Sequence, residues 1–365
     1  AARARVEAAQ ARALQAGLFP NPDLIVRMEV APIREGTTSR AEYVGGFGQR
    51  LPLGDRRSAA VRLEERERDR LEMELDVRRL EVRSRVHAAF ATALYLEEAV
   101  RIWEEAYRTS DRGAAIARAR LAAGDALPED VARAEMEALR LLSERDQTAS
   151  RRQEALLALS AALGDPRLRV ESVRGSLEDA LAIPALESLL AALSDHPLSR
   201  AADAAAAVER AREELARAQA VPDLNVELLY RRQEATHTDA FDAGLSIALP
   251  LFDRNQGRIR EARAELAAAH ARARRVLSEL EHEVREAHLR LTRAMARVRL
   301  LREEILPRSD TVLRGAELRY AGGDMSLADL LPIRRDRLQA RLSYLEALRE
   351  AIEAWWVLKP YLAKG

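Results

Sequence analysis

The sequence has no cysteine and few of the residues that mark turns or reactive pockets. Among its 365 residues are 16 Gly, 13 Pro and no Cys, and 4% are aromatic. Disulfide bonds, thiolate metal sites and cysteine nucleophiles are therefore excluded. No apolar run reaches the roughly 18 residues that a transmembrane helix needs. The 59 basic and 59 acidic residues cancel, so net charge gives no indication of nucleic-acid binding.

The residues that are abundant are those of long helices. The chain is rich in Ala, Leu, Arg and Glu, and its only lysines are Lys359 and Lys364. This composition is typical of coiled coils. No Ser-His-Asp set, P-loop or HExxH motif is visible, so the sequence predicts no catalytic residue, no cofactor and no metal site.

The chain is an internal duplication. Three motifs recur in the same order at shifts of 198 to 200 residues: NPDL (Asn21–Leu24) with VPDL (Val221–Leu224), LPL (Leu51–Leu53) with LPL (Leu249–Leu251), and LAAGD (Leu121–Asp125) with YAGGD (Tyr320–Asp324). Repeats of this kind indicate one supersecondary unit used twice. Ala1 aligns with Ala201, so the first copy lacks the equivalent of SDHPLSR, and we expect a preceding segment to be missing.

Each repeat reads as a helix, a β-hairpin, a very long helix and a return helix. The predicted boundaries are a first repeat at 1–163 (hairpin about 22–52, long helix about 55–120, return helix about 126–163), a connector at 164–197, and a second repeat at 198–358 (hairpin about 222–250, long helix about 254–320, return helix about 326–358).

The long helices carry coiled-coil periodicity. From Ile259 to Ile305 apolar residues are spaced alternately three and four apart. A helix from Arg254 to Tyr320 is roughly 100 Å long at 1.5 Å per residue. Pro307 should kink this helix without ending it. Helices of this length must pair with one another or with other subunits.

The strand segments alternate in polarity. In DLNVELLY, Leu224, Val226 and Leu228 fall on one face, and in FDAGLSIAL the apolar face includes Phe241 and Leu245. Runs of about ten residues suit a tilted transmembrane strand, although a half-buried soluble hairpin has the same pattern. Four strands cannot close a barrel, whereas three copies supply about twelve.

Several motifs resemble the TolC family of outer-membrane efflux channels, closest to the branch that serves heavy-metal and cation exporters. LRYAGGDMSLADLL (Leu318–Leu331) is similar to the family's turn before the return helix. LPLFDRNQGRI (Leu249–Ile259) is similar to its strand-to-helix exit, and SDHPLSRAADAAAAVERAREELARAQAVPDL to the helix before the second hairpin. The resemblance covers essentially the whole chain.

The resemblance implies a homotrimer in the outer membrane of a Gram-negative bacterium. Its fold would be mainly α, with long coiled-coil hairpins forming an α-barrel tube in the periplasm that continues into a 12-stranded β-barrel. It would be a passive exit duct, not an enzyme, working with a periplasmic adaptor, an inner-membrane pump and outer-membrane lipid. A periplasmic adaptor or a soluble coiled-coil scaffold is the alternative.

The resemblance also implies sites at the periplasmic tip. The gate or constriction residues would be Asp329, Asp130, Tyr320 and Arg319. A ring of carboxylates would favour cations, but an acidic residue in a first helical turn also interacts with the helix dipole. Pro332 replaces a second acidic residue of some relatives, which argues against a double ring.

Two further sets of residues are expected to have structural or docking roles. The tips that would dock an adaptor comprise Leu121, Ala122, Gly124, Asp125, Leu318, Ala321, Gly322, Gly323 and Asp324. Their glycines are also expected as helix C-caps. Pro52 and Pro250 should mark the strand-to-helix junctions, because proline cannot continue a hydrogen-bonded ladder.

Overall fold

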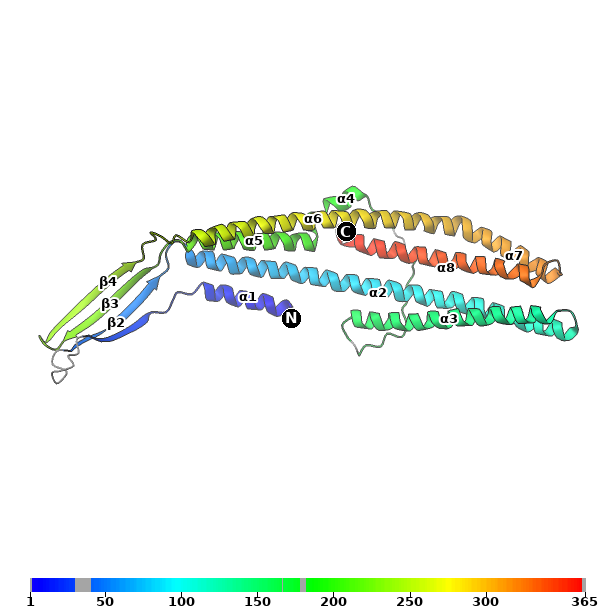
Figure 1. Cartoon of the computed structure of the whole chain (residues 1–365), viewed down its shortest axis with the longest axis horizontal. Helices are drawn as coiled ribbons and strands as arrows, with labels where there is room; N and C mark the ends of the chain where they lie inside the picture. Colours follow the sequence, from blue (N-terminus) through cyan, green and yellow to red (C-terminus); the bar gives the residue numbers. More distant parts are fainter. Residues whose placement is uncertain (1, 30–40, 166, 178–181, 363–365) are drawn as a thin grey trace. The chain divides into compact units, whose positions relative to one another are not determined.

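The structure is a computed structural model that describes residues 2–29, 41–165, 167–177 and 182–362. Helices dominate, with one four-stranded antiparallel sheet, as the sequence predicted (Figure 1). In chain order the elements are α1 (Ala2–Ala16), β1 (Asp23–Glu29), β2 (Glu42–Leu51), α2 (Arg56–Ala123), α3 (Pro128–Ala162), α4 (Leu186–Ala191), the 3-10 turn η2 (Leu193–Asp195), α5 (Pro197–Ala218), β3 (Leu224–Gln233), β4 (Thr238–Ile247), α6 (Gln256–Leu300), the π-helical turn η3 (Leu301–Ile305), α7 (Leu306–Gly322), α8 (Leu327–Leu358) and the 3-10 turn η4 (Lys359–Tyr361).

The chain forms two compact units that cut across the sequence repeats. The first unit contains residues 1–77 and 197–277, and the second contains 78–196 and 278–365. Each unit therefore takes material from both repeats. The hairpin connection at residues 30–40 lies outside the described residues.

The sheet of the first unit has the order β1-β2-β3-β4. Its register places apolar residues in rows across the strands, so that Leu24 lies opposite Phe47 and Phe47 opposite Leu228. Tyr230 lies opposite Phe241, whose side chain is 79% exposed. Alternation along each strand puts these residues on one face. The result is an exposed apolar face, as the period-two pattern predicted.

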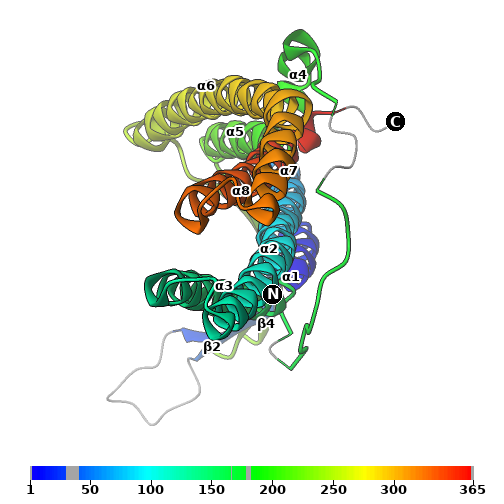
Figure 2. The ribbon, with the colours of Figure 1, turned by 90° about the vertical axis from the view of Figure 1, so that its right-hand side faces the viewer.

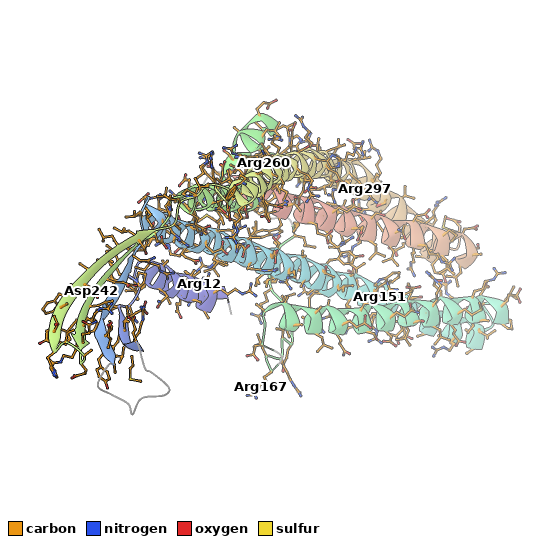
Figure 3. All side chains as sticks on the ribbon, turned by 60° about the vertical axis from the view of Figure 1, so that its left-hand side comes forward. Arg12, Arg151, Arg167, Asp242, Arg260 and Arg297 are labelled. Carbon is orange, nitrogen blue, oxygen red and sulfur yellow. The ribbon has the colours of Figure 1, made fainter. Side chains whose placement is uncertain are left out.

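The opposite face of the sheet is polar and contains a small apolar patch. Arg231 on β3 donates to Glu29 at 3.0 Å, to Glu42 at 2.7 Å and to Asp242 at 2.9 Å, so one guanidinium joins all four strands. Figure 3 labels Asp242 on the sheet. Leu229 on the same face is buried over Gly46, where an added β-carbon would lie 2.7 Å from the Leu229 Cα.

Helices of the first unit run side by side in two pairs, α1 with the start of α2 and α5 with the start of α6 (Figure 1). Arg12 of α1, labelled in Figure 3, donates to Glu64 of α2 at 2.9 Å. Arg263 of α6 donates to the buried Glu213 of α5 at 2.9 Å. The pairs repeat the same arrangement once in each half of the duplication.

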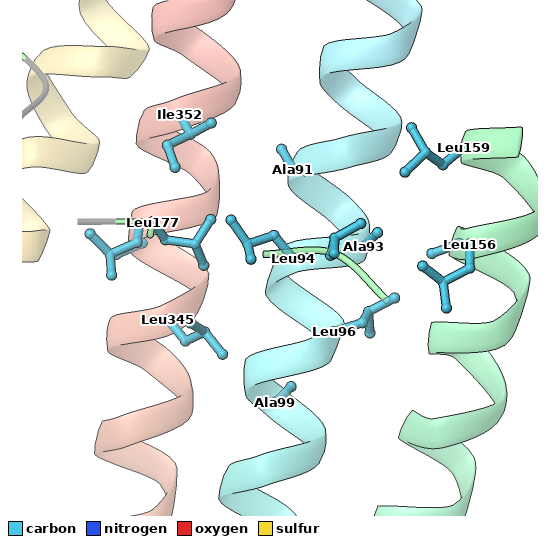
Figure 4. Close-up of a cluster of buried hydrophobic side chains, with 14 of the residues drawn as sticks. Ala91, Ala93, Leu94, Leu96, Ala99, Leu156, Leu159, Leu177, Leu345 and Ile352 are labelled. Carbon is cyan, nitrogen blue, oxygen red and sulfur yellow. The ribbon is translucent and has the colours of Figure 1, made fainter. Parts of the chain in front are cut away.

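The second unit is held by an apolar core built from both repeats. Leu94 and Leu96 of α2 pack with Leu156 of α3, and the same cluster includes Leu345 and Ile352 of α8. In Figure 4 the two leucines of α3 point toward α2, and Leu177 of the connector, a member of the same cluster, is seen over α8. Figure 2 shows α3 beside α2 and α8 beside α7. The connector therefore contributes to the core that joins the two helical hairpins.

Pro307 lies two residues beyond the one π-helical turn among the described helices. Proline has no N–H to donate to the carbonyl of Glu303, and its ring would clash with that carbonyl in a regular α-helix. The wider turn at Leu301–Ile305 accommodates this, and the helix then continues as α7. The equivalent position in the first repeat, Arg108, lies within the uninterrupted α2.

Candidate functional site

The two hairpin tips of the second unit have the same backbone geometry. Gly124 and Gly323 have φ angles of 86° and 84°. Beyond each glycine, the N–H of Asp125 donates to the carbonyl of Arg120 at 2.8 Å, and that of Asp324 to the carbonyl of Arg319 at 2.9 Å. These are Schellman caps. An added β-carbon at either glycine would meet no atom within 4 Å, so glycine is required here for its φ angle and not for space.

The residues expected to dock an adaptor lie at these tips. Leu318 is 75% exposed, whereas Leu121 is half-buried. The other members are exposed: Ala122, Gly124, Asp125, Ala321, Gly322, Gly323 and Asp324. The tips thus present small side chains and backbone to the surroundings.

Tyr320 connects the two tips. Its ring and Leu121 pack against a buried cluster formed by residues of α2, α3 and α8, namely Ala114, Ala117, Val131, Ala134 and Leu327. The guanidinium carbon of Arg120 lies 5.6 Å from the centre of the Tyr320 ring. Arg319, in contrast, has an exposed side chain and contributes its carbonyl to the cap. The structure therefore places Tyr320, but not the Arg319 side chain, in a contact between the hairpins.

Asp329 lies in the first turn of α8 and is hydrogen-bonded to the N-cap residue Ser326. Its backbone N–H donates to the Ser326 hydroxyl oxygen at 3.2 Å, and that hydroxyl donates to the Asp329 carboxylate at 2.6 Å. Asp130 has no such partner at its N-cap, because the residue there is Leu127. Asp329 is exposed and Asp130 half-buried. The two repeat-equivalent aspartates therefore have different surroundings, and Pro332 lies inside α8 just beyond Asp329.

A charged site between the hairpins was not predicted from the sequence. Glu137 of α3 is 5% exposed. Its carboxylate accepts hydrogen bonds from Arg140 on the same helix at 2.8 Å and from Arg335 on α8 at 2.5 Å. Burial alone would raise the pKa of Glu137, but the two arginines outweigh it and lower the pKa to about 2.

Three more arginines of α8 pair with acids on neighbouring helices. Arg334 contacts Glu317 of α7 at 3.0 Å, Arg337 contacts Asp310 of α7, and Arg341 contacts Glu105 of α2 at 2.7 Å. With Arg335 they line a cavity of about 230 Å³. Their spacing of three, four and seven residues follows one side of a helix. This row of arginines can be recognised in the sequence, but the acidic residues on other helices that pair with it cannot.

The expected junction prolines lie where strand ends and helix begins. Pro52 directly follows β2, and Pro250 lies three residues beyond the end of β4. Asp55 and Asn255 precede the helices with φ angles of 61° and 58°. Pro52 thus stands where the ladder of β2 stops, whereas the ladder of β4 has already stopped at Ile247 before Pro250 is reached. The left-handed residues redirect the chain into the helices.

The histidines have structural surroundings. His87 stacks on Trp356 at 3.4 Å, and burial together with nearby Lys359 and Arg83 lowers the pKa of His87. Burial lowers the pKa of His196 to about 4, and its ring stacks on Tyr361. Within the described residues, no group of three or more His, Cys, Asp or Glu side chains is arranged to hold a metal ion.

None of the helices within the described ranges is both long enough and apolar enough to cross a membrane.

Comparison with known proteins identifies relatives over nearly the whole chain. The chain is 29% identical over 357 residues to the cobalt-zinc-cadmium resistance protein CzcC of Cupriavidus metallidurans, covering 97% of this chain and 84% of CzcC. It is 27% identical over 282 residues to the nickel and cobalt resistance protein CnrC of the same organism, covering 74% of this chain and 64% of CnrC.

Solved structures share the fold. The outer membrane protein VceC from Vibrio cholerae matches with a TM-score of 0.81 at 22% identity, covering 100% of this chain and 92% of VceC. CusC, whose structures concern transmembrane channel formation, matches with a TM-score of 0.82 at 17% identity, covering 100% and 88%. The sequence pattern of the family described as "Outer membrane efflux protein" matches residues 1–165 and 189–363. The chain therefore belongs to the outer membrane efflux protein family.

Proposed function

We propose that three copies of this chain form a passive exit duct for divalent metal cations, supplied by an inner-membrane pump through a periplasmic adaptor. Family membership makes the chain an efflux protein of the Gram-negative outer membrane, and it does not favour the alternatives of an adaptor or a soluble scaffold. The trimer, the two partners and the cargo belong to the proposal.

The observation that carries the proposal is the four-stranded sheet. Its exposed apolar face, which includes Phe241 at 79% and Leu245 at 74%, needs an apolar environment. Among the described residues, its edge strands β1 and β4 are paired on one side only, and backbone groups cannot remain unpaired in lipid. Pairing β4 of one copy with β1 of the next in three copies would close a barrel of about twelve strands.

The helices support the same assembly. α2 spans 68 residues, or about 100 Å, and its buried positions are frequently Ala. Small residues let neighbouring helices approach closely. In the proposed duct the helices form the wall of a periplasmic tube, and the tips of α2/α3 and α7/α8 dock the adaptor and narrow the pore. Asp329, Asp130 and Tyr320 would line or hold the constriction.

The cargo assignment comes from the relatives. CzcC and CnrC are named for resistance to cobalt, zinc, cadmium and nickel, and we extend this class of cargo to the present chain. A duct needs no tight metal site, because its task is to let ions pass.

Planar-bilayer recording tests this function. The purified protein should insert into phospholipid bilayers and give discrete conductance steps that prefer cations to anions. A protein that stays soluble without detergent and gives no steps would contradict the proposal.

A further inference from the structure

The two strand-to-helix junctions differ in length. In the first, two residues separate Leu53 of the LPL motif from the start of α2, whereas in the second four residues separate Leu251 from the start of α6. Both junctions end in the same hydrogen bond at the start of the helix. The carbonyl of Asp55 accepts a hydrogen bond from the N–H of Ala59 at 2.9 Å, and the carbonyl of Asn255 accepts one from the N–H of Ile259 at 3.0 Å. The helix starts are therefore equivalent, and the second junction contains two extra residues.

The extra length exposes an aromatic side chain. Phe252 follows the LPL motif directly and is 92% exposed. The residue at that place in the first junction is Gly54, with a φ angle of 66°. An added β-carbon there would lie 2.5 Å from the Cβ of Val221. The first junction is thus packed closed, with no room for a side chain, while the second projects a phenyl ring.

The apolar face of the sheet continues into this junction up to the residue before Phe252. Ile247 ends β4, and Leu249 and Leu251 extend its alternation beyond the strand with exposures of 71% and 65%. An exposed run of this kind at the end of a lipid-facing strand lies where a membrane interface would be.

Two basic residues follow Phe252 in the sequence, and the Nε of one of them, Arg254, donates to the carbonyl of Pro250 at 3.3 Å. Arg254 and Arg258 are exposed. The acidic neighbour Asp253 accepts the backbone N–H of Asn255 at 2.8 Å. An aromatic residue beside arginines on long apolar stems matches the hydrocarbon and phosphate layers of a bilayer surface.

We infer that Leu249, Leu251 and Phe252 insert into the periplasmic leaflet of the outer membrane, with Arg254 and Arg258 at the phospholipid phosphates. This inference rests on the proposed function, because it requires the sheet to span the membrane with the helices on the periplasmic side. Residues 52–55 of the first junction carry no aromatic side chain, but the exposed ring of Phe19 lies 4.0 Å from the guanidinium carbon of Arg57 at the start of α2, so an aromatic side chain beside an arginine is found there too.

Nitroxide accessibility tests the anchor, and the absence of native cysteine allows single labels without background. The variants Phe252→Cys, Phe241→Cys on the sheet and Glu265→Cys on α6 are labelled and reconstituted in phosphatidylethanolamine and phosphatidylglycerol vesicles. Collisions with oxygen, which concentrates in lipid, are compared with collisions with an aqueous nickel chelate.

The anchor predicts an oxygen-to-nickel ratio at position 252 severalfold above that at 265 and close to that at 241. A ratio at 252 equal to that at 265, or a label shielded from both reagents by a neighbouring copy, would overturn the anchor while 241 still reports lipid. An aqueous ratio at 241 would instead contradict the membrane-spanning sheet and hence the proposed function.

Discussion

Arg335 on α8 and Glu137 on α3 lie 198 residues apart in the chain and form a two-point ion pair. The Arg335 Nε lies 3.1 Å from one carboxylate oxygen, and the Nη2 lies 2.5 Å from the other. Arg140 donates to the same carboxylate through Nε at 3.1 Å and Nη2 at 2.8 Å. One buried acid therefore links the return helices of the two repeats.

Replacing this acid should destabilise the second unit. Glu137→Gln keeps the shape of the side chain but leaves two guanidinium groups without their counter-charge. Removing one partner of a desolvated pair costs more than the net value of the pair, here about 1–3 kcal/mol of unfolding free energy. Guanidinium titration followed by helical circular dichroism measures the change.

A surface pair provides the matched control. Glu304 contacts Arg308 on the same helical stretch, with side-chain exposures of 50% and 72%. Glu304→Gln should change the unfolding free energy by less than about 0.5 kcal/mol. Equal effects of the two variants would show that the contact between Glu137 and Arg335 adds nothing beyond a surface pair.

The same pair should make stability depend on pH in an acidic window. The folded pKa of Glu137, about 2, lies below its ordinary value of 4.5. Its contribution is therefore complete above about pH 4.5 and is lost as the pH falls toward about 2. The stability difference between the native chain and Glu137→Gln should shrink across this window. A difference that stays constant from neutral pH to about pH 2 would contradict the lowered pKa.

The sequence predicted the elements better than the contacts between them. Heptad spacing and period-two alternation are local patterns, so the long helices and the apolar face carrying Phe241 could be read directly. The partner of Arg335 could not, because nothing local relates residues 198 positions apart. That Pro307 would disturb the helix without ending it was predicted from its missing N–H, but the π-helical turn at Leu301–Ile305 depends on how the surrounding helix relaxes.

The sequence likewise predicted some features of the candidate site and missed others. The Gly-Asp motifs identified both tips, because a left-handed cap has a strong residue preference. The packing of Tyr320 against the first repeat and the hydrogen bonds between Ser326 and Asp329 required the folded structure. The roles of Asp329, Asp130 and Arg319 in gating stay predictions.

Alanine at the tip glycines tests the cap geometry. Gly323→Ala must place an L-residue at a φ angle of 84°, which costs about 1–2 kcal/mol, and Gly124→Ala should behave alike. Gly315 provides a control of opposite sign, since it lies within α7 and an added β-carbon there would meet nothing within 4 Å. Gly315→Ala should stabilise the helix by about 0.5–1 kcal/mol. Thermal unfolding of the three variants decides this, and a loss at Gly315 matching that at Gly323 would refute the requirement for a left-handed residue.

The gating proposal for Asp329 can be separated from its capping role. Asp329→Ala should raise single-channel conductance in planar bilayers, because a side chain at the constriction is shortened, and should weaken cation preference, because a negative ring is lost. Ser326→Ala removes the capping hydroxyl and keeps the charge, so its conductance should stay near that of the native chain. Unchanged conductance in Asp329→Ala, or the same change in both variants, would assign Asp329 to the helix cap alone.

The central claim is that three copies of this chain close one membrane channel. Electron microscopy of the protein in lipid nanodiscs tests it most directly. The account predicts particles with threefold symmetry, in which β4 of each copy pairs with β1 of the next in a twelve-stranded barrel that opens into a helical tube. Particles of a single 40.7 kDa chain, or an assembly in which the strands do not pair between copies, would contradict it.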